Sequence, residues 1–234
     1  MRKFRILALM LVLIMVLAGC GTGNSTPAAK DIVILYTNDA HCGIEDGMGY
    51  QGLSAAKRAL LAAGNKVMLV DNGDAVQGDT IGTLSKGEYI IDIMNKLGYD
   101  VATPGNHEFD YGMDQFNKLV EKADFDYISC NFVDKDGNPY VIKEADGVKI
   151  AFVGISTPKT ITTSTPTYFQ DGNGNYIYGF MQDDTGEKLY AAVQSAVDAA
   201  RKEGAKYVIA MAHLHRGRLP ALDLLGCHCE HQRH

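Results

Sequence analysis

The stretch from residue 32 to residue 41, IVILYTNDAH, shows the pattern on which the fold depends. Its first part, Ile32–Tyr36, is short, fully apolar and rich in β-branched residues, which predicts a buried strand of a parallel sheet. A polar loop follows it directly. The same order returns at Lys66–Val70, which is followed by Asp71-Asn72-Gly73-Asp74. Apolar strands that end in acids or histidines are therefore expected to recur along the chain.

Further elements follow outward from this stretch. Helices are predicted at residues 53–63, 89–97, 113–123 and 187–202, from alanine- and leucine-rich or amphipathic spacing. Strands are predicted at 100–102, 127–132, 148–155 and 206–212, with turn residues at 134–138 that suggest a hairpin or meander. Residues 160–184 show little periodicity and predict a long surface loop. Without a repeat or a second domain, this alternation predicts one α/β layered fold.

The composition narrows the possible partners. The chain has 234 residues, is 46% hydrophobic and carries a formal net charge of −6. This charge excludes nucleic acid as an expected partner, because phosphate backbones are bound by basic surfaces. A small phosphate ester would need bound cations to attract it.

The amino terminus predicts export. Residues 1–5 are basic, Ile6–Leu17 is apolar, and Leu17-Ala18-Gly19-Cys20 resembles the bacterial lipobox. We expect residues 1–19 to be a lipoprotein signal peptide and residues 20–30 a tether, with acylated Cys20 anchoring the protein at the outer face of the bacterial cell membrane. A plain secretory signal is the alternative. A disulfide between Cys42 and Cys130 is possible outside the cytoplasm, but nothing in the sequence supports it.

Polar residues that suit metal binding follow the predicted strands. Ligands collect beyond the carboxyl ends of strands in α/β sheets, so four groups are expected to converge: Asp39 with His41, Asp71 with Asp74, Asn106 with His107, and His213. Residues two apart on an extended chain point to the same side, so the Asp39 and His41 side chains could hold one ion. Oxygen and nitrogen donors suit Mn, Zn, Co or Fe. Each group alone has an ordinary explanation: a turn acid for Asp71, and a histidine satisfied within the fold for His213.

Three blocks of sequence resemble the 5′-nucleotidase family of calcineurin-like metallophosphoesterases. These are YTNDAH at residues 36–41, DNGDAVQG at 71–78 and GNHEFDYG at 105–112. The resemblance runs from about Ile32 to Leu214 and implies a metallophosphoesterase domain at residues 31–214. It implies a four-layer α/β/β/α sandwich with a centre of two divalent metal ions, and hydrolysis of nucleotide phosphate esters, with 2′,3′-cyclic nucleotides as possible further substrates.

The resemblance also implies a role for each matching residue. It assigns Asp39 and His41 to one metal, Asp74 to both as a bridge, and Asn106 and His213 to the second. It makes His107 the residue that stabilises or protonates the reacting phosphate, with Asp110 orienting its imidazole. Such a pairing is chemically reasonable, because a carboxylate fixes the imidazole tautomer and raises its basicity.

The sequence departs from the family after His213-Leu214. The family continues to a Gly-His-Ser-His motif that completes both metal sites, and to a separate domain that binds the nucleoside. Residues 215–234 match neither, and we interpret them as an aberrant tail produced by a frameshift, so that the sandwich is incomplete at its carboxyl end and activity is weak or absent. The alternatives are a catalytically dead fragment at the cell surface and, less favoured, a lipid-anchored solute-binding protein.

Overall fold

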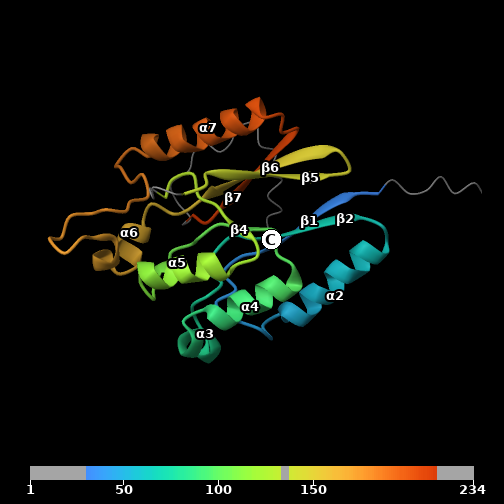
Figure 1. Ribbon diagram of the computed structural model, residues 1–234, viewed down its shortest axis with the longest axis horizontal. Helices are drawn as coiled ribbons and strands as arrows, with labels where there is room; N and C mark the ends of the chain where they lie inside the picture. The colour runs from blue at the N-terminus through green and yellow to red at the C-terminus, as the bar shows by residue number, and fades with distance from the viewer. Residues whose placement is uncertain (1–29, 133–136, 215–234) are drawn as a thin grey trace, which may run out of the picture. The chain divides into compact units, whose positions relative to one another are not determined.

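The computed structural model of the chain describes residues 30–132 and 137–214 (Figure 1). From Asp31 onward they belong to one compact unit. The expected signal peptide, Cys20, all but the last residue of the tether, the turn at residues 134–136 and the tail at 215–234 lie outside the described residues. Among the residues that are described, no helix is both long and apolar enough to cross a membrane.

The first sheet is parallel and contains the strands nearest the amino terminus. Its order is β1 (Ile32–Thr37), β2 (Lys66–Asp71), β3 (Val101–Ala102) and β4 (Asp126–Tyr127). The connecting helices are α2 (Gly49–Ala62), α3 (Thr80–Ser85) and α4 (Glu88–Leu97), and β3 leads through η1 (His107–Phe109) into α5 (Met113–Lys122). Thr37 pairs with Asp71, and Asp71 pairs with Ala102. These three strands therefore end level, and the loops that follow them start from one edge.

The second sheet is mixed. A hairpin joins β5 (Tyr140–Ala145) to β6 (Val148–Ile155), and β7 (Tyr207–Ala212) lies parallel to β6 on its other side. Between β6 and β7 the chain forms α6 (Thr160–Thr163), η2 (Pro166–Phe169) and α7 (Glu187–Lys202).

The two sheets pack face to face, with helices outside (Figure 1). Val70 of the first sheet and Phe152 and Met211 of the second belong to one buried cluster between the sheets. The neighbouring residue Leu69 points to the opposite face and packs with α2 and α4, as the two-residue period of a strand requires. On the far side, Val153 packs against α7. The predicted four-layer α/β/β/α fold is therefore confirmed.

One strand prediction is wrong in its bounds, and the turn of the predicted hairpin does not lie at residues 134–138. The strand expected at residues 127–132 is only β4, because the chain then crosses to the second sheet, where the Cys130 N–H donates to the Gly154 carbonyl at 2.8 Å. The hairpin turns at Asp146-Gly147, both with positive φ, and pairs a strand that the sequence did not reveal. Cys130 and Cys42 are free thiols.

The prediction of a surface loop at residues 160–184 is confirmed only in part: residues 172–177 are exposed, but the segment as a whole is not an unpacked loop. This segment contains α6 and η2, and it buries Phe169 and Phe180 completely. Their rings lie 5.5 and 5.3 Å from that of Phe109, which follows the expected site residue His107 by two positions. Single aromatic residues separated by polar ones show no periodicity, so the sequence did not reveal that the segment is packed.

Candidate metal centre

The loops that follow β1 and β2 are joined by backbone hydrogen bonds. The N–H groups of Asp39, His41 and Cys42 donate to the carbonyls of residues 73, 74 and 75, at 3.0, 2.8 and 3.0 Å. This ladder lies just beyond the level strand ends, and it brings the His41 side chain toward Asp74.

The backbone of these loops differs from the expected extended chain. Asp39, His41 and Asp74 have φ values of 53°, 43° and 59°, which lie in the left-handed region. Asp39 and His41 therefore do not alternate along an extended strand as predicted, although their side chains do meet. Left-handed conformations of residues other than glycine cost free energy and persist where surrounding contacts enforce them. Here the hydrogen bonds between the two loops supply those contacts.

Two glycines allow the β2 and β3 loops to approach each other. A Cβ atom on Gly73 would lie 2.4 Å from the Gly105 nitrogen, and one on Gly105 would lie 2.3 Å from Asp74 Oδ1 and 2.9 Å from His213 Cε1. No side chain fits in either place. These contacts also show that the loop holding Asn106 and His107 lies directly against Asp74.

A buried carboxylate that we did not single out from the sequence fixes this approach. Glu108 is 1% exposed. Its Oε2 accepts hydrogen bonds from the backbone N–H groups of Asp74 (2.8 Å) and Gly105 (2.7 Å), and its Oε1 accepts one from Ala75 (2.8 Å). Burial and the charge of Asp74 raise the pKa of Glu108, while the three N–H donors oppose the shift. The only signal in the sequence was its position inside the GNHEFDYG block.

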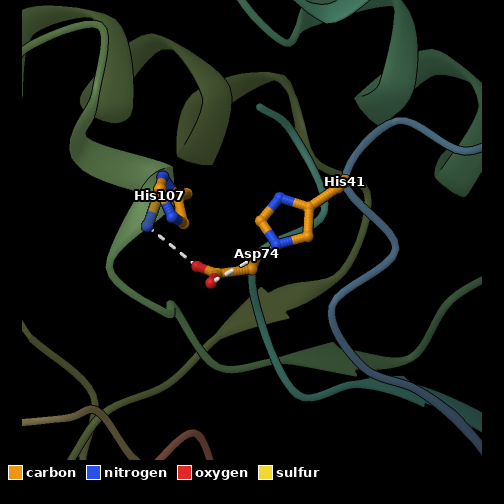
Figure 2. Close-up of side chains that lie close together, drawn as sticks. All are labelled: His41, Asp74 and His107. Carbon is orange, nitrogen blue, oxygen red and sulfur yellow. Dashed lines mark hydrogen bonds and ion pairs between the residues drawn. The ribbon is translucent and has the colours of Figure 1, made fainter. Parts of the chain in front are cut away.

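The side chains from four loops meet around Asp74. His213, which follows β7, places Nε2 3.1 Å from Asp74 Oδ2 and 4.0 Å from Asp39 Oδ1. His41 Nε2 lies 3.9 Å from the same two oxygens. Figure 2 shows Asp74 between His41 and His107. The backbone N–H of His107 donates to Asp74 Oδ1 at 2.8 Å. The predicted convergence of these loops is therefore observed.

Two of the histidines are held with one ring nitrogen directed at the cluster. His213 Nδ1 lies 3.0 Å from the Asn72 carbonyl, and His41 Nδ1 lies 3.1 Å from the Gln77 carbonyl. A carbonyl only accepts, so each Nδ1 carries a proton, and Nε2 is the nitrogen whose lone pair could bind a metal ion once any proton on it is released. Histidines that ligate metals are oriented by such contacts.

The donor atoms fit a metal ion. They form two sets that share Asp74: Asp39, Asp74 and His213, and His41, Asp74 and His107, each with its ligand atoms within 4.8 Å of one another. Donors at about 2.0–2.2 Å from one ion lie roughly 3 to 4 Å apart, which matches the separations of 3.1 to 4.0 Å. The sharing of Asp74 has the form of the expected bridge. The grouping differs from the one expected. Asp39 lies as close to His213 as to His41, and His107 belongs to the set that contains His41.

The remaining predicted residues lie around this cluster. Asn106 is 5% exposed and sits between Gly105 and His107, both of which contact Asp74. Asp71 is in neither set. It is buried beneath the site, where it accepts hydrogen bonds from the Thr37 hydroxyl (2.6 Å) and the Gly73 N–H (2.9 Å), and burial raises its pKa to about 8.

The electrostatics of the site favour a charged carboxylate and charged imidazoles. Burial alone would raise the pKa of Asp74, but the hydrogen bond and charge of His213 lower it overall. The pKa of His213 rises to about 9, because Asp74 outweighs the opposing effect of burial. The pKa of His107 also rises against burial, through its 2.6 Å hydrogen bond from Nδ1 to Asp110 Oδ2.

Comparison with known proteins identifies the family. The family model for calcineurin-like phosphoesterases matches residues 32–231. The chain belongs to this family. Calcineurin-like phosphoesterases are hydrolytic enzymes that bind divalent metal ions, which agrees with the expected enzyme class and with the donor sets around Asp74.

Relatives within the calcineurin-like phosphoesterases include nucleotidases. A 5′-nucleotidase of Vibrio cholerae is 31% identical over 215 residues, covering 85% of this chain and 37% of the relative. A 2′,3′-cyclic-nucleotide 2′-phosphodiesterase/3′-nucleotidase of Yersinia enterocolitica is 29% identical over 224 residues, covering 82% of this chain and 32% of the relative. The chain thus spans about a third of the length of these curated relatives.

Solved structures agree with the fold of calcineurin-like phosphoesterases. A 5′-nucleotidase precursor from Thermus thermophilus superposes with a TM-score of 0.64 at 24% identity, over 77% of this chain and 36% of the other. The calcineurin-like phosphoesterase YfkN from Bacillus subtilis gives a TM-score of 0.58 at 28% identity, over 77% of this chain and 61% of the other.

Proposed function

We propose that the chain is the metal-binding part of a phosphoesterase that hydrolyses nucleotide phosphate esters. The observation that carries this proposal is the meeting of two donor sets at one buried carboxylate, Asp74, at the carboxyl ends of the strands. The nucleotidases among its relatives favour a nucleoside monophosphate or cyclic nucleotide as substrate.

In this proposal two divalent ions, drawn from Mn, Zn, Co or Fe, occupy the cluster. The residues that hold them are Asp39, His41, Asp74, Asn106 and His213, with Asp74 common to both. Bound ions of this kind polarise a phosphoryl oxygen and activate water for in-line attack. With His107 assigned to the phosphate, the described donor sets offer three donors in one case and two in the other. We therefore expect the ions to be held loosely and hydrolysis by this chain to be weak.

The protein groups around the ions have their own tasks. Asp110 accepts the proton of His107 Nδ1, which leaves Nε2 as the nitrogen available to the phosphate. Burial opposes the charged form of His107, but the Asp110 hydrogen bond raises its pKa overall and so favours the protonated imidazole. A cationic imidazole in this place stabilises the developing negative charge and can protonate the leaving oxygen.

Metal binding and hydrolysis test this function together. Mn²⁺ and Co²⁺ are titrated into the full chain by calorimetry, and release of phosphate from a nucleoside 5′-monophosphate and opening of a 2′,3′-cyclic nucleotide are then measured. Asp74→Asn should lower metal affinity at least 100-fold and abolish hydrolysis, whereas the exposed control Asp124→Asn should change neither. Tight binding of metal without any hydrolysis would leave a catalytically dead fragment as the better explanation.

We also propose that the protein is exported and anchored through Cys20 at the outer face of the bacterial membrane. The support is the sequence of residues 1–20, with its basic start, apolar run and lipobox-like end. A Cys20→Ala variant should appear in the soluble exported fraction and should not incorporate labelled palmitate. Membrane association that persists in this variant would contradict lipid anchoring.

A further inference from the structure

The segment from Thr160 to Phe180, here called the 160–180 arm, packs against the loop that holds His107. Phe169 and Phe180 are fully buried, and their rings lie 5.5 and 5.3 Å from the ring of Phe109. Phe109 lies between Glu108, which holds the metal loops together, and Asp110, which bonds His107. The arm is therefore fixed in position beside Asp110 by aromatic packing.

One polar side chain of the arm reaches Asp110. Ser164 ends α6, is 8% exposed, and donates its hydroxyl to Asp110 Oδ1 at 3.3 Å. The other oxygen, Oδ2, bonds His107 Nδ1 at 2.6 Å. Among the residues that the structure describes, no other side chain or backbone group bonds the Asp110 carboxylate. Its two oxygens are thus bound by different partners, one by the arm and the other by the imidazole.

We propose that Ser164 is a positioning residue that sets the plane of the Asp110 carboxylate and, through it, the orientation of His107. The proposal rests on the proposed function, in which His107 acts on the phosphate. Rotation of a carboxylate about its terminal torsion is only weakly restricted. With His107 alone, Asp110 could turn and take the imidazole with it, whereas a second partner on Oδ1 holds the plane.

Hydrogen bonds within the 160–180 arm hold the Ser164 hydroxyl near Asp110. The Ser164 N–H donates to the Thr160 carbonyl at 3.1 Å, which closes the turn of α6 and fixes where the hydroxyl begins. The nearby hydroxyls of Thr162 and Thr163 bond the Lys159 carbonyl instead, and both residues are exposed. Of the three hydroxyl residues Thr162, Thr163 and Ser164, it is Ser164 that is directed at the carboxylate behind His107.

The expected size of the effect follows from the length of the bond. At 3.3 Å the contact is longer than the usual O–H···O bond. The free energy lost with this hydrogen bond should therefore lie at the low end of the range for a bond to a charged group. We expect Ser164→Ala to lower kcat about fivefold to tenfold. KM should stay unchanged, because Ser164 contacts neither the metal donors nor the phosphate position.

The test uses the full chain and reads the imidazole directly. In chain loaded with diamagnetic Zn²⁺ and labelled with ¹⁵N-histidine, the Nδ1 proton of His107 should give a low-field resonance because its bond to Asp110 is short. Ser164→Ala should broaden this resonance or shift it upfield. Ser164→Thr, which keeps a hydroxyl, should restore both the resonance and kcat. The matched control Thr162→Ala removes a hydroxyl that bonds only Lys159 and should change neither.

An unchanged resonance and unchanged kcat in folded Ser164→Ala would overturn the proposal. If Ser164→Thr fails to fold, the comparison of Ser164→Ala with Thr162→Ala still decides it. If the unmodified chain shows no hydrolysis with Mn²⁺ or Co²⁺, the proposed function fails. The resonance of His107 would still show whether Ser164 orients the imidazole.

Discussion

Replacing Glu108 with glutamine should destabilise the protein, because this carboxylate joins the loops after β2 and β3. The substitution keeps the size of the side chain but exchanges one acceptor oxygen for a donor. If the amide oxygen takes the place of Oε2, it keeps the bonds from the Asp74 and Gly105 N–H groups. The amide nitrogen then faces the Ala75 N–H, which loses its acceptor.

The cost can be worked out from these contacts. A hydrogen bond to a charged group contributes about 1.5–3 kcal/mol, and a buried donor left without a partner costs about 1–3 kcal/mol. Part of this is offset, because burial and Asp74 raise the pKa of Glu108 and its charge is therefore unfavourable in itself. We expect a net loss of about 2 kcal/mol in the free energy of unfolding.

Urea unfolding followed by circular dichroism measures this loss, and the absence of tryptophan makes a secondary-structure signal the practical choice. The control is Glu121→Gln on the exposed side of α5, which should stay within about 0.5 kcal/mol of the unmodified protein. A Glu108→Gln variant equally close to the unmodified protein would refute the reasoning. It would mean that a neutral side chain satisfies the three N–H groups as well as a carboxylate does.

Three further outcomes are expected. Gly105→Ala should weaken Mn²⁺ binding more than tenfold in calorimetry, because its methyl carbon would lie 2.3 Å from Asp74 Oδ1; unaltered affinity would show that the loops can move apart. Phe180→Ala should lower the free energy of unfolding in urea by about 3–5 kcal/mol by leaving a cavity among the aromatic rings, and a loss below about 1 kcal/mol would mean that the arm is not part of the core. His213 has its pKa raised from 6.5 to about 9, so the stability it contributes to the metal-free protein is complete below pH 6.5 and is lost as the pH rises through 9. Unfolding of the metal-free protein should therefore become easier over this interval, by on the order of 2 kcal/mol, and a His213→Gln variant should lack this dependence.

The sheets and the position of the site could be predicted because both depend on simple rules. The apolar run Lys66–Val70 is a strand whose last three residues are buried between layers. The run Ile32–Tyr36 is a strand as predicted, but at the edge of the sheet it is only partly buried, and Tyr36 is 68% exposed. Parallel strands that end level bring their following loops together. The loop residues Asp39, Asp74 and His213 could thus be expected to meet although they are far apart in the chain.

The local geometry of the site could not be predicted in the same way. The left-handed backbone at Asp39 and His41 is stabilised by hydrogen bonds to another loop. Asp and His adopt this region more often than other non-glycine residues, but that preference does not reveal where the chain will use it. The importance of Glu108 lies in three N–H groups, two of which come from the distant loop after β2. Likewise, the packing of Phe169 depends on a partner, Phe109, 60 residues away (169 − 109). Such contacts between distant segments are invisible to periodicity and turn propensity.

The pairing of Asp74 with His213 has a consequence for how the molecule is held together. Asp74 follows a strand of the first sheet and His213 follows a strand of the second, and 141 residues separate His213 from Asn72, the neighbour that orients it. An ion held by both side chains would act as a cross-link between the two sheets and close a loop of nearly that length, much as a disulfide does. Bound metal should then slow global unfolding of the protein. A chelator that removes the ion from the edge where the loops meet should make both sheets unfold more readily.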